Sequence, residues 1–162
     1  AARVWRAAVL SADDGPPAGS ARFEVHFDHA ALPVLVTDEP PPLGGDDGPH
    51  PPRLLTVAVA TCLSASLLFA MRKFKNEPGP LRTEALARLV RNPAGRWRVG
   101  GIEVVIHLGV PQHTLKLAGR VLAQFEEFCV VTQSVRAAIP VEVRVLDADG
   151  LPVPADQPGP SL

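Results

Sequence analysis

The sequence predicts an α+β fold with antiparallel strand pairing, on two observations. Strand-like alternation comes in runs, and only two segments have helical periodicity, so the predicted order is three strands, a long helix, two strands, a second helix and a last strand. Such an order favours antiparallel sheets over a doubly wound fold. The 162 residues, 46% apolar and 20% charged, suit one globular domain. We expect that domain to cover residues 1–147, followed by a Pro/Gly-rich tail, residues 148–162.

Short strands are predicted in the N-terminal third of the chain. Phe23, Val25 and Phe27 alternate with polar residues, a pattern typical of a half-buried strand. Neighbouring strands are predicted at residues 4–10 and 32–36. The loop that follows, DEPPPLGGDDGPHPP, has no periodicity, and loops of that length are often functional or lie at an interface.

The segment from Leu54 to Lys75 predicts one long helix, and Pro51 and Pro52 suit its first turn. No residue between Leu54 and Met71 is charged, so a membrane span is one interpretation. However, the run contains serines, threonines and alanines and is flanked by amphipathic strands, which favours a helix surrounded by protein. A sheet in the same subunit can cover only one side of such a helix. We therefore expect a homodimer, with no membrane partner.

The C-terminal half predicts further elements of both kinds. Alternation at 81–91 and 102–108 predicts an antiparallel hairpin. Apolar residues at three- and four-residue steps predict a second helix over 114–128, and 141–145 predicts the last strand. We expect the chain from residue 147 on to be disordered or loosely draped, because it is rich in proline and glycine.

Cys62 and Cys129 are the only cysteines. They are too few for a secreted disulfide scaffold, they lack zinc-type spacing, and the histidines show no metal-binding pattern. No secretory signal is evident, and the net charge of −1 does not suggest a nucleic-acid partner, so we expect a cytoplasmic protein. A buried inert thiol is one interpretation of each cysteine. A redox pair is the other, and it requires Cα atoms roughly 4.4–6.8 Å apart.

Two segments carry a family resemblance. GGDDGPHPPRLLTVAVATC has a Gly-rich loop, G-x-x-P and a long helix of small and apolar residues that reaches A-x-C. EEFCVVTQSVRAAIPVEVRV has a cysteine at a helix start, followed by a terminal strand. These segments resemble the two cysteine sites of the OsmC/Ohr family, the osmotically inducible and organic hydroperoxide resistance proteins. The resemblance covers Val4 to Leu146 and implies a divergent OsmC-like fold, with antiparallel sheets wrapped around two central helices in an intertwined homodimer.

The resemblance also implies an activity, the thiol-dependent and peroxiredoxin-like reduction of organic hydroperoxides in oxidative-stress defence. Cys62 matches the peroxidatic cysteine, which would become a sulfenic acid, and Cys129 matches the resolving cysteine, which would condense with it to a disulfide. An external thiol, in the family often a lipoyl protein or a small dithiol, would then reduce the disulfide. No metal or organic cofactor is implied.

Several positions depart from the family pattern. Characterised members have an arginine near the active cysteine, held by a glutamate at the start of the long helix, and the arginine favours the thiolate. Here Pro52 and Arg53 occupy the positions where the acid is expected. The arginine positions of the two branches correspond to residues 41–43 and to DDGPPAGS, which contain no arginine. Val130 stands where a proline usually follows the second cysteine.

Arg53 and Arg22 are the alternative cations for activating the thiol or binding substrate. Nine residues at ~100° each place Arg53 on the helix face opposite Cys62, so it would reach the thiol only across a dimer interface or from a bent helix start. The more ordinary interpretations are a solvated charge for Arg53 and an outward strand residue for Arg22. The departures favour an alternative function, a divergent member without efficient peroxidase activity that binds a small apolar or electrophilic ligand at the dimer interface.

Overall fold

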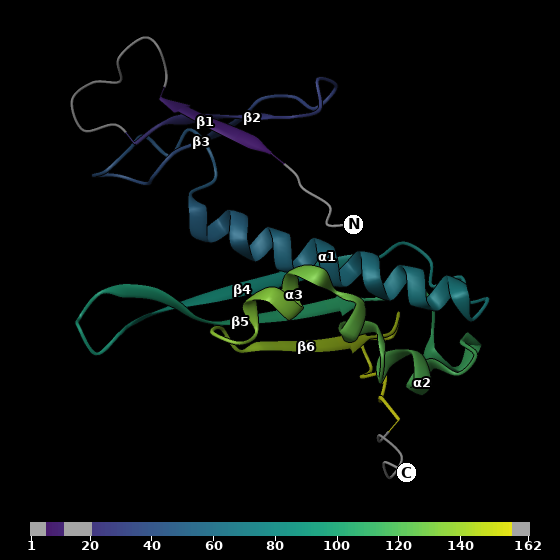
Figure 1. The fold of residues 1–162 in the computed structure, drawn as a ribbon. Coiled ribbons are helices and arrows are strands. Elements are labelled where there is room, and N and C mark those ends of the chain that lie inside the picture. Colours follow the sequence, from purple (N-terminus) through teal and green to yellow (C-terminus); the bar gives the residue numbers. More distant parts are fainter. Residues whose placement is uncertain (1–5, 12–20, 157–162) are drawn as a thin grey trace. The chain divides into compact units, whose positions relative to one another are not determined.

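The structure is a computed structural model that describes residues 6–11 and 21–156 (Figure 1). These residues form strands, one long helix and several short helical segments, as the α+β prediction requires. The chain divides into two compact units, Ala1–Leu54 and Leu55–Leu162. The start of the predicted first strand and the predicted turn at DDGPPAGS lie outside the described residues. The domain boundary predicted at residue 147 stays a prediction.

The first unit contains a three-stranded antiparallel sheet. Its strands are β1 (Ala7–Ser11), β2 (Phe23–Phe27) and β3 (Leu35–Thr37), in the order β1-β2-β3. The three predicted strands are thus present, with the third shifted toward the following loop. Phe23 and Phe27, predicted to face a core, are exposed in the single chain, as are Val9 and Leu10. The alternation therefore marks an apolar face that this chain leaves exposed.

The loop between β3 and the long helix is built around Asp38. The buried carboxylate of Asp38 accepts hydrogen bonds from the N–H groups of Glu39 (2.8 Å), Gly45 (2.8 Å) and Asp47 (3.2 Å). Burial alone would raise the pKa of Asp38, but these three donors favour the carboxylate and lower its pKa. A Cβ atom at Gly44 would lie 2.2 Å from Asp38 Oδ1, so only glycine fits there. The loop has no helix or strand, as predicted, but a defined shape.

The second unit contains a three-stranded mixed sheet. Its strands are β4 (Arg82–Arg91), β5 (Trp97–His107) and β6 (Val141–Leu146), in the order β4-β5-β6. The antiparallel β4–β5 hairpin confirms the prediction. The expectation of purely antiparallel sheets is wrong, because β6 pairs with β5 in parallel. The physical reason is the long connection between them, since a crossover with helical segments can return the chain in the same direction.

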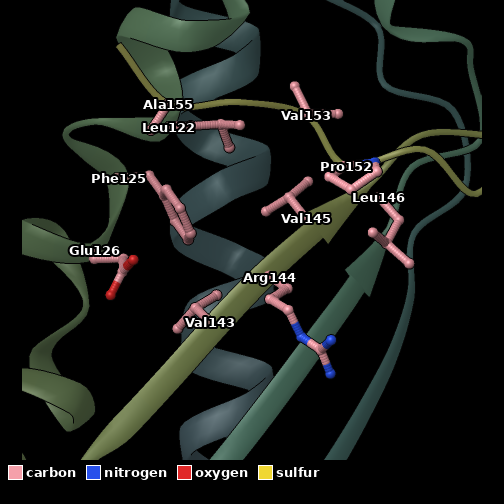
Figure 2. A pocket seen from close by; sticks show the side chains of 10 residues that line it. All are labelled: Leu122, Phe125, Glu126, Val143, Arg144, Val145, Leu146, Pro152, Val153 and Ala155. Carbon is pink, nitrogen blue, oxygen red and sulfur yellow. The ribbon is translucent and has the colours of Figure 1, made fainter. Parts of the chain in front are cut away.

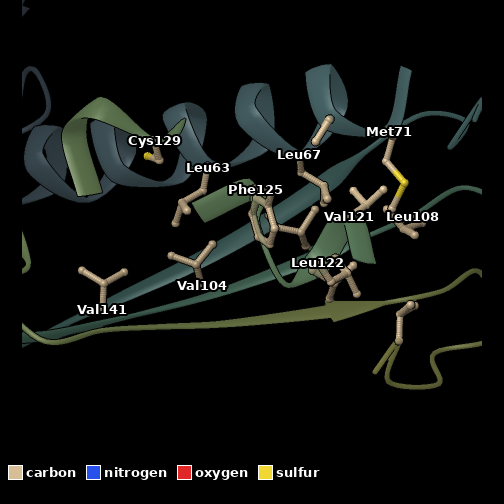
Figure 3. Close-up of a cluster of buried hydrophobic side chains, with 14 of the residues drawn as sticks. Leu63, Leu67, Met71, Val104, Leu108, Val121, Leu122, Phe125, Cys129 and Val141 are labelled. Carbon is tan, nitrogen blue, oxygen red and sulfur yellow. The ribbon is translucent and has the colours of Figure 1, made fainter. Parts of the chain in front are cut away.

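The long helix α1 (Pro51–Lys73) begins slightly earlier than predicted and has both prolines in its first turn. From Val59 to Met71 its buried residues recur at three- or four-residue steps (Val59, Leu63, Leu67, Ala70 and Met71). They pack with the inner face of the second sheet, which contributes Ile102, Val104 and Ile106 (Figure 3). A hydrogen bond of 2.7 Å between Ser64 Oγ and Thr83 Oγ1 links the helix to β4. The remaining face of α1 is exposed and includes Val57 and Phe69.

By length and composition α1 could also cross a membrane, with a mean hydropathy of 2.2 in its most apolar window. A core helix of a water-soluble domain passes the same test. The buried stripe facing the second sheet favours the core-helix interpretation made from the sequence.

The predicted second helix over 114–128 is wrong as a continuous helix, and α1 is the only long helix among the described residues. The segment instead forms short pieces: η1 (Gln112–Thr114), α2 (Ala118–Leu122), η2 (Phe125–Phe128) and α3 (Val130–Val135). Leu117 has a left-handed backbone (φ 52°), and the extended backbone of Cys129 separates η2 from α3. The apolar spacing still identified buried residues, among them Val121 and Phe125. Short helical turns produce this spacing without an unbroken helix.

The chain after β6 packs against the second unit as far as residue 156, so the expectation of a disordered or loosely draped tail is wrong for 148–156. Val153 is buried, and its N–H donates to Val145 O at 2.9 Å. The buried Asp147 carboxylate accepts N–H bonds from Gln112 (3.0 Å), Asp149 (3.0 Å) and Leu151 (2.9 Å). Composition alone could not reveal these anchors.

We expect Asp147 to make the protein less stable in acid. The N–H of Gln112 is the largest of the influences that lower the pKa of Asp147, and those of Leu151 and Asp149 add to it. A carboxyl whose pKa is lower in the folded than in the unfolded protein stabilises the folded state above the unfolded pKa, which is about 4. This stabilisation is lost as the pH falls through the pKa of the folded state. Urea unfolding at several acidic pH values should show a shallower pH dependence for Asp147→Asn than for the wild type. The exposed neighbour provides the control, because Asp149→Asn should retain the wild-type slope.

Candidate functional site

Cys62 lies in the middle of α1, between the buried stripe and the exposed face. It is partly buried and packs against the core cluster, whereas the adjacent Leu63 is fully buried. Its position follows from helix geometry, because a residue next to the buried stripe is turned ~100° away from it. Cys62 therefore combines contact with the core and partial access to solvent.

Cys129 lies at the junction of η2 and α3, where it is the N-cap residue of α3. Its side chain is 0% exposed. The thiol donates a hydrogen bond of 2.9 Å to Thr132 Oγ1, and the Thr132 N–H donates to Cys129 Sγ at 3.4 Å. The predicted helix ended at Phe128, and in the structure Cys129 precedes the first residue of α3, so the cysteine lies at a helix start, as the family resemblance implies.

Side chains before and after Cys129 in the sequence stabilise this junction by hydrogen bonds and an ion pair. The Arg136 guanidinium forms an ion pair with Glu126 and donates a hydrogen bond to Val141 O at 3.3 Å. The Gln133 side-chain amide donates to Glu126 O at 3.4 Å. These bonds link η2, α3 and the start of β6, so they restrict where the Cys129 sulfur can lie.

The two cysteines, distant in sequence, meet at one core, because Cys62 packs against the buried cluster to which Cys129 belongs. Burial raises the pKa of Cys129, a side-chain hydrogen bond with Cys62 raises it further, and the two hydrogen bonds with Thr132 oppose the increase. Both cysteines are free thiols. Figure 3 shows Cys129 beside α1 with Leu63 nearby. The two predicted thiols thus belong to the same part of the core.

Arg53 and Arg22, the two predicted cations, have other interactions. Arg53 Nη1 forms an ion pair of 2.9 Å with Asp46 Oδ1 in the loop, and the Arg53 N–H donates to His50 Nδ1 at 3.2 Å. The charge of Arg22 acts on the Asp38 carboxylate and lowers its pKa. The role of either arginine at Cys62 stays a prediction.

Thr132 is the residue at this site that the sequence interpretation missed. Its spacing was a usable signal, because an N-cap side chain accepts a hydrogen bond from a backbone N–H two or three residues later. The prediction of one continuous helix over 114–128 hid this signal, since it placed Cys129 directly after a helix end rather than at a helix start.

A pocket of about 270 Å³ lies beside β6 and the packed tail. Figure 2 shows the side chains that line it. Apolar side chains dominate its lining, and Glu126 and Arg144 add charge; the lining residues are Leu122, Phe125, Glu126, Val143, Arg144, Val145, Leu146, Pro152, Val153 and Ala155. Because neither cysteine lines it, we do not assign this cavity to thiol chemistry. Among residues 6–11 and 21–156, no cluster of three or more His, Cys, Asp or Glu side chains could hold a metal ion.

Comparisons with known proteins agree with this fold. The family model described as OsmC-like protein matches residues 44–144, which include both cysteines. An OsmC-like protein of unknown function from Vibrio cholerae has a similar structure, with a TM-score of 0.72 and 18% identity over 88% of this chain and 99% of the other. No curated protein matches the chain.

Two structures of organic hydroperoxide resistance proteins are also similar. OhrB of Bacillus subtilis aligns with a TM-score of 0.64 and 16% identity over 88% of this chain and 98% of that one. A protein of this kind from Legionella pneumophila aligns with a TM-score of 0.66 and 18% identity over 90% of this chain and 98% of its own. At these identities the structures show a shared fold, and the family model covers most of the chain. The chain therefore belongs to the OsmC-like protein family.

Proposed function

We propose that the protein reduces organic hydroperoxides, with Cys62 as the peroxidatic cysteine and Cys129 as the resolving cysteine. The observation that carries the proposal is that Cys62 packs against the core cluster that contains Cys129 and acts on the Cys129 thiol, although the two come from different parts of the chain and are its only cysteines. The similarity to proteins named for organic hydroperoxide resistance supports the substrate class. We propose a cytoplasmic location, where an external dithiol or a lipoyl protein would regenerate the thiols.

The proposed reaction has three balanced steps. The Cys62 thiolate attacks the terminal peroxide oxygen, the O–O bond breaks, and the departing alkoxide takes a proton to become an alcohol, leaving Cys62 as a sulfenic acid. The Cys129 sulfur then attacks the Cys62 sulfur, and the sulfenic oxygen leaves as water with the Cys129 thiol proton. Two thiol groups of the external reductant finally reduce the disulfide and are themselves oxidised.

Disulfide mapping tests this proposal directly. We expect the reduced protein, treated with one equivalent of an organic hydroperoxide and digested without reductant, to give a Cys62–Cys129 cross-linked peptide. One equivalent of alcohol should form at the same time. The proposal fails if no cross-link forms and peroxide consumption does not exceed that of a Cys62→Ser control.

A second candidate function is the binding of a small apolar or electrophilic ligand without efficient peroxide turnover. The observation that favours it is the ion pair between Arg53 and Asp46. Arg53 is one of the two cations predicted to activate the Cys62 thiol, and in the structure its charge is paired with Asp46 instead. This function predicts slow alkylation of Cys62 and thermal stabilisation by small electrophiles. Rapid peroxide turnover would exclude it.

We further propose that two copies of the chain form a homodimer around α1. Phe69 is 67% exposed on this helix, and Val57 is exposed on the same face. Exposed apolar side chains on a helix face are a common mark of a protein–protein interface. A second copy would bury that face. This agrees with the expectation from the sequence that a sheet of one subunit covers only one side of the uncharged helix.

A single substitution tests the homodimer. Light scattering coupled to gel filtration should give about twice the chain mass of 17.2 kDa for the wild type. Phe69→Glu should shift the protein toward the monomer, because it would bury a charge in the interface. Leu151→Glu alters another exposed apolar side chain away from α1 and should leave the mass unchanged. A monomeric wild type would contradict the proposal.

A further inference from the structure

Thr132 forms two hydrogen bonds with the Cys129 sulfur. Thr132 Oγ1 accepts the thiol proton at 2.9 Å, and the Thr132 N–H points to the same sulfur at 3.4 Å. Both side chains are 0% exposed, so water does not compete for these groups. The two bonds approach the sulfur from one side and limit its rotation.

We propose that Thr132 is a positioning residue for the resolving step, in which its hydroxyl and N–H hold the Cys129 sulfur toward Cys62. This inference rests on the proposed function and deepens it by assigning a residue to the second chemical step. The role is specific to that step, because the hydroxyl and the N–H of Thr132 both bond to Cys129.

The chemistry of the resolving step explains why a hydroxyl is useful at this position. Cys129 loses its thiol proton as the S–S bond forms, and the proton leaves with the sulfenic oxygen of Cys62 as water. The Thr132 hydroxyl accepts a hydrogen bond from the thiol, and it can rotate to donate one when the sulfur carries negative charge. It therefore suits both states of the sulfur without a change of partner.

The surroundings of Cys129 make such a partner necessary. Burial and then the hydrogen bond with Cys62 raise the pKa of Cys129, whereas the bonds with Thr132 lower it. Cys62, on α1, is the titratable group whose charge acts on Cys129. Without the hydroxyl, the developing negative charge would form in a buried site with the Thr132 N–H as its remaining partner from α3.

Two substitutions isolate the hydroxyl, and a third provides a matched control. Thr132→Val removes the hydroxyl but keeps the β-branched shape and the backbone N–H, and Thr132→Ser restores the hydroxyl. Ser134→Ala removes a hydroxyl from the same short helix, but Ser134 Oγ bonds to Val130 O at 2.8 Å and not to the thiol. Thr132→Ala serves as a second hydroxyl-free variant if the valine variant does not fold.

The first measurement does not depend on peroxide chemistry. In a Cys62→Ser background Cys129 is the only thiol, so its ionisation can be followed by the ultraviolet absorbance of the thiolate. We expect Thr132→Val to move the titration midpoint upward by about one pH unit, because the thiolate loses a hydrogen-bond donor. Thr132→Ser and Ser134→Ala should titrate like the background protein.

The second measurement separates the two chemical steps in the protein with both cysteines. After one equivalent of organic hydroperoxide, quenched samples report peroxide loss and disulfide formation separately. Thr132→Val should slow disulfide formation by about tenfold and leave peroxide loss within twofold, and serine should restore the rate. An unchanged midpoint in Thr132→Val, or an equal shift in the serine variant, would overturn the positioning role. If the midpoint shifts but no peroxide is consumed, Thr132 still stabilises the Cys129 thiolate, and the proposed function is overturned.

Discussion

Replacing Cys62 by serine is expected to reduce catalytic hydroperoxide consumption to the uncatalysed background, because a serine hydroxyl is neither a comparable nucleophile nor oxidised by the peroxide. Replacing Cys129 by serine should have a different result. The first turnover should proceed, since Cys62 is still present, but no intramolecular disulfide can form. The sulfenic acid at Cys62 should then persist and oxidise further with excess hydroperoxide.

Peroxide consumption in the presence of a small dithiol measures the first of these effects. A reagent specific for sulfenic acids, followed by mass spectrometry, should label Cys62 in Cys129→Ser and give less label in the wild type, where the disulfide forms. Wild-type turnover by Cys62→Ser would remove Cys62 from the mechanism. Failure of Cys129→Ser to consume even one equivalent would show that Cys129 acts in the first step and not only in resolution.

Leu67→Ala is expected to be strongly destabilising. Leu67 lies on the buried stripe of α1, is 0% exposed and belongs to the cluster between α1 and the second sheet (Figure 3). Removing its side chain should cost about 2–5 kcal/mol, because the loss of apolar burial is accompanied by a cavity. In a protein of this size, each kcal/mol lowers the melting temperature by about 2–4 °C.

An exposed leucine on the second sheet provides the control for this substitution. Leu86 on β4 is 56% exposed, so Leu86→Ala makes the same chemical change without opening a cavity. Its cost should stay below about 1 kcal/mol. Urea unfolding of the two variants under the same conditions measures the difference. Equal costs would mean that Leu67 is not part of the core that its burial indicates.

The elements that the sequence predicted correctly are those in which local pattern and burial coincide. The β4–β5 hairpin was predicted because Ile102, Val104 and Ile106 alternate with more exposed residues, and these three side chains are buried. The long helix was predicted from its length and its proline start, and α1 spans Pro51–Lys73. In both cases neighbouring residues carry the information, so no distant contact was needed to infer the element.

The second helix was predicted wrongly for a related reason. Apolar spacing identified Val121 and Phe125 as buried, but that spacing does not require a continuous backbone between them. The left-handed Leu117 interrupts the predicted helix, and the extended Cys129 separates η2 from α3, where the chain follows the core in short turns. The consequence for the site is direct, because the interruption makes Cys129 an N-cap residue with Thr132 as its partner.

The sequence by itself determined the α+β class, the hairpin, the long apolar helix and the identity of the two cysteines. Only the tertiary structure decided that β6 runs parallel to β5, that residues 148–156 pack, and that both cysteines contribute to one core. The physical reason is the range of the contacts. Periodicity records which side of a segment is buried, and it is the same for parallel and antiparallel strands. The approach of Cys62 to Cys129 depends on packing between segments distant in the chain, which no local pattern encodes.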